Sequence, residues 1–121
     1  MKIKYLIHAT NFTPQVVVQC DMATVRITGK CLPLNPDNFF QGMLEKIAFM
    51  EEINLEVDID YMNSFSFRYL LEIIVNHPML KKVVWYYDDF DSDMEDKGRI
   101  IQETLEKRMV NRTFEIRRKA A

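Results

Sequence analysis

The sequence predicts an α/β protein in which a mixed β-sheet carries helices on one face only. Strand-like and helix-like segments follow one another in the order β-β-β-α-β-α-β-α-β. Strands that alternate with helices indicate βαβ units with right-handed crossovers. Residues 55–61 alternate strictly between apolar and acidic side chains, which indicates that one face of the sheet is open. We expect residues 1–121 to form a single domain, because 121 residues can bury a sizeable core.

The first third of the chain is strand-like. In its third strand, Val25 and Ile27 share one face, while Arg26 and Thr28 share the other. Gly29 interrupts this alternation and predicts a bulge or bend. The three strands are expected at residues 4–8, 15–20 and 24–30.

The first helix is predicted to begin after Asn35, a favourable N-cap residue that Pro36 follows at the first helical position. We expect this helix to end near Glu51. Its apolar residues recur at helical spacing and predict a core-facing stripe. They are Phe40, Met43, Leu44 and Ile47.

The strand expected at residues 55–61 places its carboxylates on the open face of the sheet. These acids are expected to pair with Arg26 or Lys30 on the neighbouring strand. They are Glu56, Asp58 and Asp60.

A second helix is predicted to follow this strand. Ser64 occupies the position of an N-cap, with Asn63 before it. His77 and Pro78 end the helix, because the residue before a proline is kept out of the α region. The core-facing stripe consists of Phe67, Leu70, Leu71 and Ile74.

The same helix has a second apolar stripe, formed by Phe65, Tyr69 and Ile73, with Arg68 on the same side. A polar surface would be expected there if the helix only covered a sheet. One interpretation is that the stripe packs on a neighbouring element of the chain. The other is a docking surface with Ser64 at its rim, for a protein partner or for a second copy in a homodimer.

The last third predicts a strand, a helix and a final strand. Val83, Trp85 and Tyr87 share one face of the strand at residues 82–87. The helix is expected at residues 94–108 and the final strand at residues 113–117. The stripe of the helix consists of Met94, Gly98, Ile101 and Leu105.

The composition indicates which classes of partner and which cellular compartment to expect. The formal net charge of −2 offers no basic excess for nucleic acid or an anionic membrane. No apolar run approaches membrane-spanning length or resembles a secretory signal. We therefore expect a cytoplasmic protein without nucleic-acid or membrane partners. Cys20 and Cys31 are interpreted as reduced thiols in the core.

Enzyme signatures are missing from the sequence. It has no glycine-rich phosphate loop, and neither His8 nor His77 has metal-ligand or triad spacing to other residues. We therefore expect no catalytic residue, metal or cofactor. Residues 88–96 hold six carboxylates, which are interpreted as a solvated turn that complements the dipole of the next helix. A metal-dependent hydrolase that uses this turn is the alternative from a different class.

Four stretches, taken in order, resemble the motifs of one known family. Residue 64 is serine where the family has threonine, and Phe65 replaces a small polar neighbour. Cys31 and Leu34 replace a serine and a glutamate. The stretches are residues 10–16 (TNFTPQV), 29–35 (GKCLPLN), 61–66 (YMNSFS) and 84–98 (VWYYDDFDSDMEDKG).

On these motifs the chain resembles the SiaC family of bacterial regulatory phosphoproteins, which have a STAS-like fold. The resemblance implies a non-catalytic signalling protein. In this family a Ser/Thr protein kinase phosphorylates the protein and a PP2C-type phosphatase removes the phosphate. The resemblance also implies a diguanylate cyclase as the partner of the unmodified form, and so a role in c-di-GMP signalling. An anti-sigma factor antagonist, which also has a STAS fold and a serine at this helix start, is the alternative among binding modules.

Carried over to this chain, the phosphoacceptor is Ser64, with Ser66 as the alternative. A phosphate at a helix N-terminus is compatible with the helix dipole, so the fold should survive modification. A partner packed over Ser64 would have to bury that charge, which is costly. The expected partner-binding residues are Asn63, Phe65, Arg68, Tyr69 and Ile73.

Overall fold

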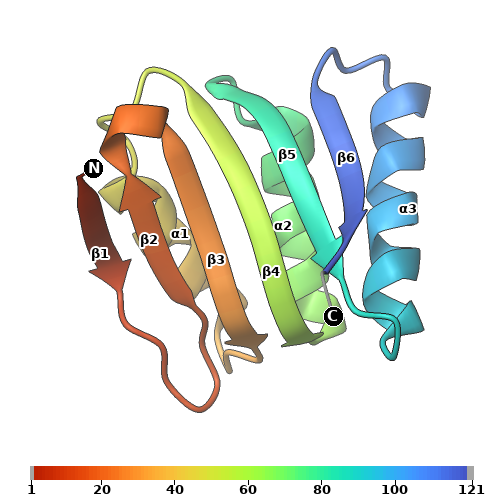
Figure 1. Ribbon diagram of the computed structural model, residues 1–121, viewed down its shortest axis with the longest axis horizontal. Coiled ribbons are helices and arrows are strands. Elements are labelled where there is room, and N and C mark those ends of the chain that lie inside the picture. Colours follow the sequence, from red (N-terminus) through yellow and green to blue (C-terminus); the bar gives the residue numbers. More distant parts are fainter. Residues whose placement is uncertain (1, 120–121) are drawn as a thin grey trace.

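The computed structural model describes residues 2–119, and within them the chain forms one six-stranded sheet and three α-helices (Figure 1). The order of elements confirms the prediction. The strands are β1 (Ile3–Ile7), β2 (Gln15–Gln19), β3 (Thr24–Cys31), β4 (Ile53–Met62), β5 (Leu80–Tyr87) and β6 (Thr113–Arg118). The helices are α1 (Pro36–Lys46), α2 (Ser64–Asn76) and α3 (Ser92–Lys107), and a short 3₁₀ turn, η1 (Cys20–Met22), joins β2 to β3.

The sheet is mixed, as predicted, and its strands lie side by side in chain order. The pairs β1–β2 and β2–β3 are antiparallel, whereas β3, β4, β5 and β6 are parallel. Each parallel connection contains one helix, and the three helices cover the same face of the sheet (Figure 1). The parallel strands therefore all end at one edge of the molecule, where the loops to α1, α2 and α3 begin.

The helix boundaries differ from the prediction mainly in α1, which ends at Lys46 rather than near Glu51. Ile47 leaves the helical conformation with φ −102° and ψ 6°, and both Ile47 and Met50 turn into the core. The chain therefore leaves the helix one turn earlier than predicted, in a conformation that buries both side chains. The bulge predicted at Gly29 is confirmed, with φ +112° and a register shift toward Lys30.

The packing of α3 on the sheet follows the predicted stripe, since Met94, Gly98, Ile101 and Leu105 are all buried. Trp85 on β5 is completely buried beneath them, and its indole Nε1–H donates to the Met94 carbonyl at 2.7 Å. A Cβ at Gly98 would lie only 2.7 Å from Trp85 Cδ1. The glycine is therefore required for this close approach between helix and ring.

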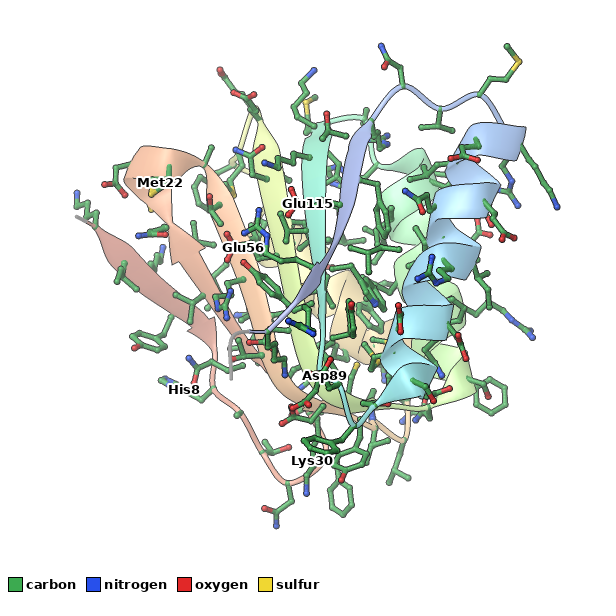
Figure 2. All side chains as sticks on the ribbon, turned by 45° about the vertical axis from the view of Figure 1, so that its right-hand side comes forward. His8, Met22, Lys30, Glu56, Asp89 and Glu115 are labelled. Carbon is green, nitrogen blue, oxygen red and sulfur yellow. The ribbon has the colours of Figure 1, made fainter. Side chains whose placement is uncertain are left out.

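The other face of the sheet is open and carries a network of charges, including Glu56 and Glu115 (Figure 2). Arg26 forms ion pairs with Glu56 at 2.6 Å and Asp58 at 2.8 Å, as the strand alternation predicted. Of the two expected partners of these acids, Arg26 takes this role, whereas Lys30 forms no ion pair within residues 2–119 and its ammonium group lies 5.7 Å from the ring centroid of Tyr61. Exposed pairs of this kind contribute little stability but keep the face polar.

The two cysteines differ from each other, and one prediction is wrong. Cys31 is fully buried at the end of β3, as expected. Cys20 is exposed, because the chain leaves β2 at this residue and turns through η1 instead of continuing the strand. Both thiols are free.

No helix between residues 2 and 119 combines the length and the apolar character that are needed to cross a membrane.

Candidate functional site

The start of α2 is capped by Asn63, and not by Ser64 as predicted. The Asn63 side-chain oxygen accepts the Ser66 backbone N–H at 2.8 Å, and Asn63 has extended backbone angles. Its own N–H donates to the Cys31 carbonyl at 3.2 Å, which ties the cap to β3. An asparagine directly before the first helical residue reaches the third N–H of the helix. Ser64 is therefore the first helical residue, and its exposed hydroxyl is not needed for capping.

This cap leads to a stability prediction. Asn63→Ala should lower the free energy of unfolding by about 1 kcal/mol, because the first turn of α2 loses its side-chain acceptor. Asn63→Asp should keep most of the stability, since aspartate is also a good N-cap. Urea denaturation of the two variants measures the difference, and equal losses would contradict the capping role.

Ser66, the alternative phosphoacceptor, is completely buried. Its hydroxyl lies beside the Cys31 thiol but forms no hydrogen bond of normal geometry with any residue in 2–119. Burial raises the pKa of Cys31 to about 11, and the nearby Ser66 hydroxyl lowers it in part. A kinase could reach Ser66 only after local opening of α2, whereas Ser64 is exposed in the folded protein.

The contrast between the two thiols is directly testable. At pH 8, Cys20 should react rapidly with a disulfide reagent, while Cys31 stays protected by burial and by its raised pKa. Colorimetric titration should therefore count one thiol per native chain and two after denaturation. Rapid reaction of the native Cys20→Ser variant would contradict this assignment.

The sequence left open whether the second stripe of α2 packs within the chain or is exposed for a partner. The structure shows that one part of the stripe is exposed and another part packs on α1. Phe65 is 66% exposed and projects from the first turn. Tyr69 and Ile73 instead face α1, and Tyr69 stacks on Phe40 at a centroid distance of 6.1 Å. Arg68 is exposed and makes no ion pair or hydrogen bond within residues 2–119.

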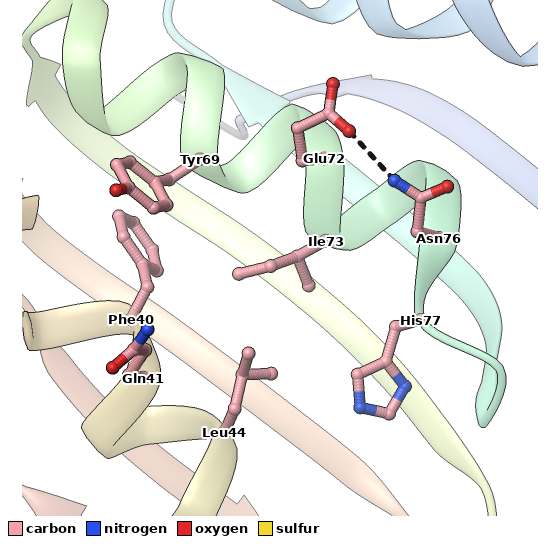
Figure 3. A pocket seen from close by; sticks show the side chains of 8 residues that line it. All are labelled: Phe40, Gln41, Leu44, Tyr69, Glu72, Ile73, Asn76 and His77. Carbon is pink, nitrogen blue, oxygen red and sulfur yellow. Dashed lines mark hydrogen bonds between the residues drawn. The ribbon is translucent and has the colours of Figure 1, made fainter. Parts of the chain in front are cut away.

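Between α1 and α2 lies an open groove of about 370 Å³ (Figure 3). Phe40, Leu44 and Ile73 supply apolar walls, while polar side chains stand around them (Figure 3). Glu72 is the charged member, and its carboxylate accepts a hydrogen bond from the Asn76 amide at 2.8 Å. The full lining is Phe40, Gln41, Leu44, Tyr69, Glu72, Ile73, Asn76 and His77.

The two histidines have structural or surface positions, as predicted. His77 follows α2, and its Nδ1 accepts the Met79 N–H at 3.2 Å. Burial, and to a smaller extent the charge of Arg112, lower the pKa of His77, which favours the neutral imidazole. His8 is exposed and stacks on Tyr5.

The acidic turn has a structural role that the sequence analysis anticipated. Asp91 caps α3, and its Oδ1 accepts the Met94 N–H at 3.3 Å. Asp88 accepts the Phe90 N–H at 3.2 Å, and Asp93 forms an ion pair with Lys97. No group of three or more metal-binding side chains converges anywhere in residues 2–119. The turn therefore provides no geometric support for the metal-dependent hydrolase alternative.

Large exposed apolar side chains gather where the parallel strands end, and sequence reasoning missed most of them. Besides Phe65, these are Leu34 (96% exposed) and Phe90 (98%) in strand-to-helix loops, and Tyr61 (62%) at the end of β4. Each belongs to a loop or strand end at the edge of the sheet where α2 begins (Figure 1). The sequence feature that could have indicated their exposure is an apolar residue inside a polar turn, as in the Asp-Phe-Asp segment at residues 89–91. Several large apolar side chains exposed at one edge of a sheet indicate a candidate protein interface.

Comparisons with known proteins identify one family model and structures with a similar fold. The model of a family described as SiaC family regulatory phosphoprotein matches residues 7–114. SiaC of Pseudomonas aeruginosa has a similar structure, with a TM-score of 0.72 and 16% identity over 98% of this chain and 100% of that one. A structure of the diguanylate cyclase SiaD with its activator SiaC, from the same organism, matches with a TM-score of 0.75 and 15% identity, over 96% and 99% of the two chains. No curated protein sequence matches.

Proposed function

Because this chain belongs to the SiaC family of regulatory phosphoproteins, we propose that it is a non-catalytic signalling protein whose partner binding is switched at Ser64. The observation that carries the proposal is the position of Ser64. It is exposed at the first residue of α2, next to the exposed ring of Phe65. A phosphate there would stand within the apolar surface that a partner would cover.

A diguanylate cyclase is the proposed partner. The support is the similar structure in which SiaC of Pseudomonas aeruginosa is the activator of the cyclase SiaD. In this chain the contact would involve Phe65, Arg68 and Tyr69 on α2, with Ile73 in the adjacent groove. Asn63 would contribute indirectly, because its side chain caps the helix that presents these residues.

The modifying enzymes of this switch are a Ser/Thr protein kinase and a PP2C-type phosphatase. Ser64 suits both, because its hydroxyl is exposed and does not cap the helix. The first turn of α2 contains no acidic residue, so its helix dipole is free to interact with an added phosphate. Phosphorylation should therefore leave the fold intact and act on the surface.

The test is phosphosite mapping by mass spectrometry on protein isolated from its native cells, with fragmentation that separates Ser64 from Ser66. We expect phosphate on Ser64 and none on the buried Ser66. A Ser64 that stays unmodified across growth conditions, with full peptide coverage, would overturn the switch. Phosphate only on Ser66 would show that the acceptor had been assigned to the wrong serine.

A further inference from the structure

A second hollow lies at the edge where the parallel strands end, separate from the groove between α1 and α2. It measures about 370 Å³ and opens between the loops that follow β4 and β5. Crevices beyond the carboxyl ends of parallel strands are common binding positions in α/β proteins. Its lining consists of Ile59, Asp60, Tyr61, Asp88, Phe90, Asp91 and Lys119.

The aromatic side chains of this hollow are unusually exposed. Phe90 is 98% exposed and Tyr61 is 62% exposed, so neither ring gains much from the core. The Lys30 ammonium group already lies 5.7 Å from the ring centroid of Tyr61, which places a cation against this ring within the chain itself. These rings offer faces on which a further planar cation can stack.

The charge of the hollow is negative and incompletely balanced. Its single lysine, Lys119, is engaged with Asp58 at 2.6 Å and Asp60 at 3.2 Å. Asp88 and Asp91 each use one oxygen to accept a backbone N–H. The second oxygen of each carboxylate has no hydrogen bond or ion pair with residues 2–119. The hollow therefore complements a cation that can form hydrogen bonds.

From this combination of rings and unpaired carboxylate oxygens, we infer that the hollow receives an arginine side chain of the protein partner. A guanidinium group is planar, stacks on aromatic rings and donates two parallel hydrogen bonds to carboxylates. The inference rests on the proposed function, because Tyr61 stands three residues before Ser64 and a partner seated on α2 would also reach this edge. The partner would thus be held at two places on either side of Ser64.

The first arm of the test needs no partner protein. N-acetyl-arginine methylamide is titrated into the isotope-labelled protein, with the neutral citrulline analogue as the matched probe, and amide shifts are followed by NMR. We expect saturable shifts at Tyr61, Asp88, Phe90 and Asp91 with arginine, and shifts at least fivefold smaller with citrulline. Equal responses to both probes, or arginine shifts spread over the whole surface, would overturn the inference.

The second arm measures the affinity of a diguanylate cyclase from the same cells by calorimetry. Phe90→Ala, and Asp88→Asn combined with Asp91→Asn, should each weaken binding at least tenfold. Asparagine retains the turn and cap acceptors, so the unfolding temperatures should stay close to that of the parent. Phe49→Ala and Asp96→Asn are matched controls outside the hollow and should bind like the parent.

The outcomes separate this inference from the proposed switch. Weaker binding by the hollow variants, with no effect of Ser64→Asp, would support the hollow and overturn the switch. Loss of binding with Ser64→Asp, but unchanged binding by the hollow variants, would overturn the hollow and support the switch. If the cyclase does not bind the parent protein, the arginine and citrulline titrations decide the inference alone.

Discussion

Ser64→Asp is expected to weaken binding of the diguanylate cyclase by more than about a hundredfold while leaving the stability of the fold unchanged or slightly higher. A carboxylate at this position would be buried without a counter-charge when a partner covers Phe65, and such a charge costs several kcal/mol. A coupling of about 3 kcal/mol already corresponds to more than a hundredfold in affinity. Calorimetric titration of the variant with the cyclase measures this effect.

Although Ser64→Asp should bind the cyclase more weakly, its free energy of unfolding should be unchanged or slightly higher than that of the parent. The first turn of α2 has no acidic residue, so a carboxylate there would complement the helix dipole by about 0.3–1 kcal/mol. Thermal unfolding would detect any loss, and a loss of several degrees would mean that weak binding reflects a damaged fold.

Two further variants make the result specific to Ser64. Ser64→Ala should bind like the parent and should no longer respond to the kinase. Thr113→Asp adds the same charge at an exposed position at the start of β6, at the opposite end of the sheet, and should not affect binding. If Ser64→Asp and the parent bound the cyclase with equal affinity, the proposed switch at Ser64 would be contradicted.

Gly98→Ala is expected to lower the free energy of unfolding by about 1–3 kcal/mol, although alanine is the better helix former. The added Cβ would lie 2.7 Å from Trp85 Cδ1 and 3.1 Å from Nε1. The ring is completely buried and cannot move aside without disturbing its hydrogen bond to the Met94 carbonyl. Urea denaturation, with the near-ultraviolet signal of this one tryptophan, measures both effects.

Gly42→Ala is the matched control in α1. Apart from its chain neighbours and the backbone of its own helix, a Cβ at Gly42 would meet no atom within 4 Å, so mainly the helix propensity changes. This variant should be more stable than the parent by about 0.4–1 kcal/mol. Opposite signs for the two substitutions would support close packing at Gly98, and equal gains would contradict it.

Much of the fold was predictable because its signals are local. The stripe of α3 was correct at each of its four residues, since 3.6-residue periodicity directly reports which side of a helix is buried. The bulge at Gly29 was also predictable, because a glycine that interrupts strand alternation often marks a bulge or bend. The open face followed from alternation in β4, and Arg26 pairs there with two of the predicted acids.

The errors arose where the local sequence is compatible with two conformations. Asn63 and Ser64 are both favourable N-caps, and only the backbone angles showed that Asn63 takes this role. Cys20 continued a strand-like run, but the turn into β3 begins at that residue and exposes it. The end of α1 was misplaced because Ile47 and Met50 are buried by a turn rather than by a further helical turn.

Local sequence was sufficient for the order of the elements, the stripe of α3 and the motif that makes Ser64 the candidate, because each depends on residues close together in the chain. In α2 the predicted stripe was only half correct, since Leu70 and Ile74 are buried but Phe67 and Leu71 are partly buried. Which apolar side chains remain exposed to solvent could be seen only in the tertiary structure. The parallel crossovers bring the loops after β4 and β5 to one edge, where Tyr61 and Phe90 border a common hollow. They also divide the second stripe of α2, because α1 lies against Tyr69 and leaves Phe65 exposed. Exposure depends on which distant segments pack nearby, and that depends on how the whole chain crosses the sheet.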